Sequence, residues 1–171
     1  MSRPTLIAST SDAPWLPGGS TAEVWAGTEV EVPDTCIIVR LLLTRADADG
    51  RRFFCLPTYR GLDLPTMSLG TGPEQMSVAD ALSLLSERVL GRAELELICL
   101  GYVRNVVPAR DADYVYPTPW AHVPVFTLPP AVETLPVVTG SWLTLDAARP
   151  DLSGRHWWPI VEHHLAASRS G

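Results

Sequence analysis

Residues 70–91 read GTGPEQMSVADALSLLSERVLG and contain the strongest helix pattern of the chain. Ser77 and Asp80 form a capping-box pattern, and Gly91 stands where a helix commonly ends. The apolar side chains between them recur at helical spacing on one face: Val78, Ala81, Leu82, Leu85 and Val89. The sequence therefore predicts a helix from Ser77 to about Leu90, with Leu82 and Leu85 buried against a sheet.

Strand patterns precede this helix. CIIVRLLLT (36–44) is a continuous apolar run, typical of a strand buried on both faces, and RFFCLP (52–57) follows it. The Asp49-Gly50 pair between the two runs predicts a hairpin, because glycine accepts the positive φ of a tight turn. Residues 58–72, rich in Pro, Gly and Thr, are expected to form a long loop.

Further strands and a second helix follow it. ELELICLGYVRNVV (94–107) and AHVPVFTL (121–128) are predicted strands, and residues 151–168 contain a closing helix with Pro159 in its first turn. Strands thus alternate with only two strong helices, which excludes a helical bundle, and the early hairpin excludes a purely parallel sheet. The pattern indicates an α/β fold with a mixed β-sheet.

Length and composition indicate one domain. The chain has 171 residues, 46% of them hydrophobic, which suffices for a core without metal or disulfide support. Residues 1–20 hold several Pro, Gly and Ser residues and are expected to form an irregular N-terminal arm. We therefore divide the chain into this arm and a single domain over residues 21–171.

Charge and cysteine content exclude several classes of protein. The net charge is −6, which argues against a basic nucleic-acid-binding surface, and the sequence contains no lysine, which excludes a Walker-type phosphate loop and a Schiff-base lysine. Cys36, Cys55 and Cys99 are far apart in apolar runs, so we expect buried thiols and a reducing cytoplasm. No apolar run is long enough for a membrane span, and a cytoplasmic location is expected.

Three further features identify a family resemblance. Leu56-Pro57 ends the hairpin strand, Gly70 and Gly91 stand 21 residues apart, and SWLTLDAA (141–148) precedes the closing helix. With the order of elements, these features resemble a Nudix domain over roughly residues 35–167. The resemblance implies a Nudix-like α/β/α sandwich with a mixed β-sheet.

The resemblance also implies a metal site on the predicted helix. The family's box reads G-x5-E-x7-R-E-U-x-E-E-x-G-U, with U aliphatic, and its glutamates hold magnesium against a diphosphate. An ungapped match aligns its glutamates and arginine with apolar or basic residues of this chain: Met76, Leu84, Leu85, Arg88 and Val89. Shifted by three residues, the match brings Glu87 under one glutamate, so the box is degenerate in this sequence.

By this resemblance Glu87 is the catalytic carboxylate, Asp80 and Glu87 are metal ligands, and the cofactor is Mg²⁺ or Mn²⁺ if the protein is active. Glu74 adds a candidate loop carboxylate. The alternative is that Asp80 caps the helix and Glu87 is a solvated charge. Arg88, at an acid position of the box, would repel a cation and attract phosphate.

Four residues are candidate ligand-binding groups: Arg60, Tyr102, Arg104 and Trp120. An arginine fork suits a diphosphate, and aromatic rings can stack a base, although surface arginines and an aromatic cover for a sheet edge explain the same pattern. By the resemblance, Asp63 is expected near the opening of the same ligand site as Arg60 and Arg104. His156, His163 and His164 are expected at a surface helix end.

Two functions fit these residues. The first is a hydrolase of a nucleoside diphosphate linked to another group. The second is a catalytically inactive module of the same fold that binds a small nucleotide-like ligand or a protein partner. The expected partner is a small, nucleotide-like molecule, with neither nucleic acid nor membrane as partner, and a homodimer is one assembly that the sequence allows.

Overall fold

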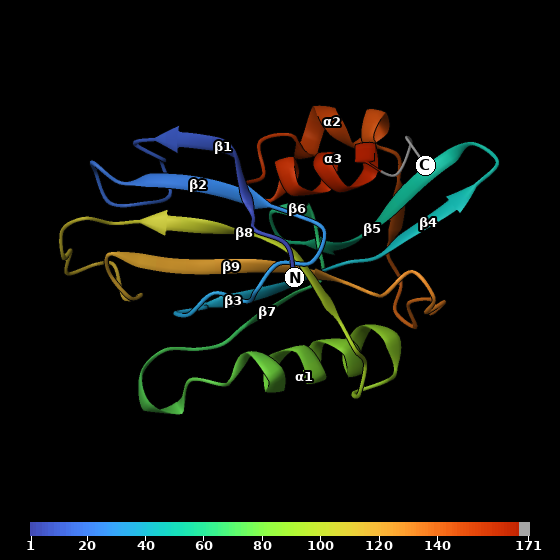
Figure 1. Ribbon diagram of the computed structural model, residues 1–171, viewed down its shortest axis with the longest axis horizontal. Helices are drawn as coiled ribbons and strands as arrows, with labels where there is room; N and C mark the ends of the chain where they lie inside the picture. The colour runs from blue at the N-terminus through green and yellow to red at the C-terminus, as the bar shows by residue number, and fades with distance from the viewer. Residues whose placement is uncertain (168–171) are drawn as a thin grey trace.

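The computed structural model describes residues 1–167 and has a mixed β-sheet between helices (Figure 1). The six-stranded sheet has the order β1-β2-β8-β9-β3-β7, in which only β3 and β9 pair in parallel. Its strands are β1 (Thr5–Ser11), β2 (Thr21–Ala26), β3 (Ile38–Leu42), β7 (Thr66–Ser68), β8 (Ile98–Val106) and β9 (Trp120–Thr127). The mixed sheet expected from the sequence is confirmed.

A smaller antiparallel sheet has the order β10-β5-β4, and β6 pairs with β5. Its strands are β4 (Thr44–Asp47), β5 (Gly50–Thr58), β6 (Gly61–Asp63) and β10 (Ser141–Leu143). The β4–β5 hairpin pairs Asp47 with Gly50, as the Asp-Gly signal predicts. Residues 58–72, expected as a loop, instead contain β6, β7 and the start of the 3-10 turn η1 (Gly72–Glu74).

Helices cover both faces of the large sheet. Figure 1 shows α1 (Val78–Leu90) on one side, and α2 (Leu145–Leu152) and α3 (Trp158–Ala167) on the other. This is the predicted α/β/α sandwich. The closing helix is expected within residues 151–168, of which Ser168 lies outside the described residues. No helix in the described part of the chain is both long and apolar enough to cross a membrane.

The principal helix forms as its caps predict. The Ser77 hydroxyl accepts a hydrogen bond from the Asp80 amide at 3.0 Å, and Gly91 ends the helix with a φ of 69°. Leu85 is buried at 1% exposure, Leu82 is partly buried against the same cluster, and Leu84 is 46% exposed. The predicted helix rotation is therefore correct.

The N-terminal residues differ from the expected irregular arm. Residues 5–11 form β1, which pairs antiparallel with β2 and becomes an edge of the large sheet. Thr, Ser and Ala dominate this segment, so its hydrophobicity gives no strand signal. Pairing with the backbone of β2 makes this segment a strand, because an unpaired strand edge offers hydrogen bonds to any extended segment.

The three cysteines are buried and free, as expected.

Leu85→Ala is expected to lower the free energy of unfolding by about 2–5 kcal/mol, since it opens a cavity beneath α1. Leu84→Ala is the matched control on the same helix, and its exposed side chain predicts a change within about 0.5 kcal/mol. Urea denaturation of both variants measures the difference. Equal losses in the two variants would show that α1 packs through a different face.

Candidate functional site

A cavity of about 770 Å³ opens beside the large sheet, between the β5–β7 segment, α1 and the start of α3. We call it the Asp63 cavity. Four arginines, two aspartates and one histidine contribute to its lining: Arg40, Arg60, Arg88, Arg155, Asp63, Asp113 and His156. The volume falls within the range of about 300–1,000 Å³ typical of small-molecule sites. Its charged lining is thus mostly cationic.

The carboxylate of Asp63 is the hub of this lining. Its Oδ1 accepts hydrogen bonds from Arg40 Nη1 at 2.7 Å, Trp157 Nε1 at 2.8 Å and the Leu64 amide at 2.8 Å. Its Oδ2 lies 3.6 Å from Arg155 Nη1. Strand β6, strand β3 and the residues before α3 therefore meet at one side chain.

Arg40 is the most deeply buried of the four arginines. Only 6% of the residue is exposed, and its Nη1 also donates to Thr66 Oγ1 at 2.7 Å. Burial lowers the pKa of Arg40, and neighbouring Arg155 lowers it further, while Asp63 opposes both. Among the described residues, the buried Arg40 Nε has no hydrogen-bond acceptor.

The sequence predicts His156 at a surface helix end, and that expectation is wrong. His156 precedes α3, lies partly buried in the cavity lining, and places Nε2 3.4 Å from Arg40 Nη2. Burial lowers its pKa to about 4, and the charges of Arg40 and Arg155 act in the same direction. His156 is therefore neutral at neutral pH.

Aromatic rings form another part of the wall. Tyr114 and Tyr116 meet edge to face, with ring centroids 5.5 Å apart, and both line the cavity. Trp15, from the β1–β2 connection, packs against the His156 ring at 5.8 Å. The two tyrosines are thus part of the cavity wall, while Trp120 and His122, which follow them in the sequence, belong to β9.

Arg60 lines the cavity, as does Arg88. Arg60 is exposed, with its guanidinium carbon 5.2 Å from the ring centre of Tyr59. Arg155 fixes the backbone beneath it, because its Nη2 donates to the carbonyls of Arg60 at 2.7 Å and Leu62 at 3.0 Å. Two residues predicted near the mouth, Arg60 and Asp63, are therefore brought together.

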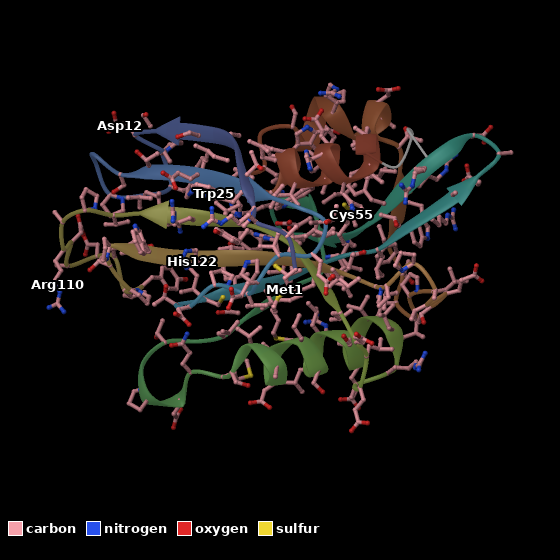
Figure 2. All side chains as sticks on the ribbon, in the orientation of Figure 1. Met1, Asp12, Trp25, Cys55, Arg110 and His122 are labelled. Carbon is pink, nitrogen blue, oxygen red and sulfur yellow. The ribbon has the colours of Figure 1, made fainter. Side chains whose placement is uncertain are left out.

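The other predicted ligand-binding residues lie elsewhere. Arg104 Nε and Nη2 donate to Glu23 Oε2 at 2.8 and 2.6 Å, and the guanidinium carbon lies 4.8 and 5.2 Å from the ring centres of Trp25 and Trp120. Tyr102 stacks on Trp25. Figure 2 shows Trp25 and His122 on the strands that flank β8. None of these residues lines the Asp63 cavity.

Asp80 and Glu87 are exposed on α1, and neither lines the cavity. Asp80 takes part in the helix cap, where Ser77 Oγ donates to its Oδ2 at 2.7 Å. Glu74 is exposed in η1. Within residues 1–167, no three His, Cys, Asp or Glu side chains come together in a way that could hold a metal ion. The catalytic and metal-binding roles of these carboxylates stay predictions.

Sequence reasoning missed Arg40 and His156. A signal for Arg40 was present, because a lone arginine within a strand buried on both faces requires a carboxylate partner. His156 carried no local signal, because Arg40, the side chain that it contacts, lies 116 residues away in the chain.

The pKa of His156 predicts a pH-dependent stability. The folded protein holds this pKa near 4, below the unfolded value of about 6.5, so the unfolded chain binds more protons between those values. Acidification from about pH 7 to pH 5 is therefore expected to lower the free energy of unfolding by about 1–2 kcal/mol through this histidine. Urea denaturation of wild type and His156→Gln at both pH values measures it. The pKa of His164 is lowered to about 4 as well, so the variant should keep part of the slope. An unchanged slope would contradict the assignment.

Comparisons with known proteins give structural matches alone: no family model matches the chain, and no curated protein does. A candidate NUDIX hydrolase from Listeria monocytogenes superposes with a TM-score of 0.56 at 10% identity, covering 78% of this chain and 94% of that one. A pyrophosphohydrolase of Bacillus subtilis, solved as a point mutant, gives a TM-score of 0.42 at 12% identity over 79% of this chain and 68% of that one. The sandwich around the mixed sheet is the Nudix fold.

Proposed function

We propose that this protein is a Nudix-fold module that binds a small nucleotide-like anion in the Asp63 cavity and does not turn it over. The observation that carries the proposal is the charge of the lining, in which four arginines stand against two aspartates. Arginine forks match the geometry of phosphate oxygens, and each forms charge-assisted hydrogen bonds. The cavity is therefore suited to an anion.

The aromatic wall supports a ligand with a ring. Tyr114, Tyr116 and Trp15 line the cavity together with the arginines. Flat rings beside cationic groups provide one place for a base and another for phosphate. The pattern favours a nucleotide-like molecule over inorganic phosphate alone.

Hydrolysis is the second candidate, and the Nudix fold supports it. It would require a divalent cation near Glu87 and Asp80, because a diphosphate is hydrolysed where positive charge faces the developing negative charge. Both carboxylates are exposed and neither lines the cavity, whereas Arg88 of the same helix does. A guanidinium at that place disfavours a cation, so the geometry supports binding better than turnover.

Binding is expected without a divalent cation. Calorimetric titration of ADP-ribose and nucleoside triphosphates in EDTA measures it, and Arg88→Gln is expected to weaken the affinity about tenfold through loss of a charged hydrogen bond. Arg92→Gln is the matched control, since Arg92 is exposed just beyond the same helix and does not line the cavity. Trp120→Ala tests whether the ligand binds beside Arg104 and Trp120 and not in the Asp63 cavity. A loss in Trp120→Ala with none in Arg88→Gln would move the ligand to the Arg104 side of the sheet.

Turnover of the same compounds with Mg²⁺ or Mn²⁺ is expected to be weak or absent. The assay compares wild type with Glu87→Gln, in which the predicted catalytic carboxylate is neutral. Robust turnover that disappears in Glu87→Gln would establish the hydrolase and overturn the binding module. Robust turnover that persists in the variant would also overturn it, and would place the catalytic carboxylate elsewhere.

A further inference from the structure

We propose that the part of the Asp63 cavity lined by Arg40, Arg155 and His156 is a metal-independent seat for a tetrahedral dianion. This inference rests on the proposed function and deepens it, because it names the part of the ligand that the cavity holds: a phosphoryl-like group. The positive charges of the two arginines would neutralise the anion, as a metal ion does in a diphosphate site.

The charges around Asp63 are unbalanced. Two guanidinium groups, those of Arg40 and Arg155, share the single carboxylate of Asp63, at 2.7 and 3.6 Å. The side chains of these three residues are 7%, 24% and 17% exposed, in the order Arg40, Arg155 and Asp63. A charge removed from water without a partner is costly, so one positive charge in this cluster lacks its counterpart. An anion in the cavity would supply it.

Arg40 also has a buried donor without an acceptor. Arg40, with only 6% of the residue exposed, lines the cavity, and its Nε has no acceptor among the described residues. A buried donor without an acceptor costs free energy, and native structures rarely leave one unpaired. Arg155 Nη1 makes no hydrogen bond to Asp63 Oδ2, because the two atoms are 3.6 Å apart.

His156 lies among charged and aromatic groups from four segments of the chain. The groups that face it are Arg40 from β3, Asp63 from β6, Arg155 from its own segment and the Trp15 ring from the β1–β2 connection. The two arginines and burial keep its pKa at about 4. A dianion beside the ring would reverse this balance and favour a protonated imidazole, which is a further donor. Binding of the anion is therefore coupled to proton uptake.

The helix after this segment adds to the same field. Helix α3 begins at Trp158, two residues beyond His156, and its first turn contains no acidic residue. The amino-terminal end of a helix carries partial positive charge, which favours an anion nearby. The two arginines and this helix end therefore favour an anion, while a divalent cation would be repelled.

Sulfate is the probe for this seat, because it is a tetrahedral dianion whose charge is constant between about pH 5 and pH 8. Calorimetric titration in EDTA is expected to show binding to wild type. Arg155→Gln should weaken the affinity about tenfold through loss of a charged hydrogen bond. Arg52→Gln, whose arginine pairs with Asp47 in the β4–β5 hairpin, is the matched control and should leave the affinity unchanged. Equal affinity in wild type and Arg155→Gln, or binding that requires magnesium, would overturn the seat.

The pH dependence gives a readout that a purely structural role would not move. Sulfate affinity of wild type is expected to rise as pH falls from about 8 to 5, because protonation of His156 accompanies binding. The rise should be smaller in His156→Gln. The same rise in both proteins would contradict the role of His156, and this comparison holds even if Arg155→Gln fails to fold.

Two comparisons separate the seat from the proposed function. If ADP-ribose binds in EDTA but sulfate neither binds nor competes, the seat is wrong and the binding module stands. If sulfate binds as predicted but no nucleotide does, the seat stands and the proposed function is wrong. Acetate, a planar monoanion, is expected to bind more weakly than sulfate, and tighter binding of acetate would overturn the assignment to a phosphoryl-like group.

Discussion

The three hydrogen bonds to Asp63 Oδ1 hold the walls of the cavity together. One oxygen accepts from Arg40 in the middle of β3 and from Trp157 at the start of the closing helix. Both donor residues are almost fully buried, so loss of the Asp63 carboxylate would leave two buried donors without their acceptor. The position of β6, and with it the path of the chain from β5 to α1, depends on this carboxylate.

Elements with strong local signals were predictable from the sequence. The cap of α1 and the β4–β5 turn depend on residues within a few positions of one another, such as Ser77 with Asp80. Strand β1 was not predictable in this way, because its pairing with β2 provides its hydrogen bonds and its own residues are mostly small and polar. Strands β6 and β7 have three residues each, too few for a periodic pattern.

The residues of the candidate site were likewise predictable only where a local feature of the sequence marked them. Arg60 and Asp63 were found because they lie in the segment that the family resemblance marks as the mouth. Arg104 was placed there too, although the alternation of side chains along β8 sends Arg104 to one face and Asn105 to the other, and only Asn105 lines the cavity. A shift of one residue in a strand thus decides between two surfaces, and the sequence alone did not determine which residue of β8 lines the cavity.

The pairing of β1 with β2 has a consequence for any shortened version of this protein. Trimming to residue 21, the boundary suggested by composition, would leave β2 as the outer strand with its backbone groups unpaired. Such an edge is a template for pairing with a second chain, so the trimmed protein should self-associate through β2. It would also lack Trp15, which packs against His156, and its cavity would be open on that side. The segment expected as an irregular arm therefore both protects the sheet edge from other chains and encloses part of the Asp63 cavity.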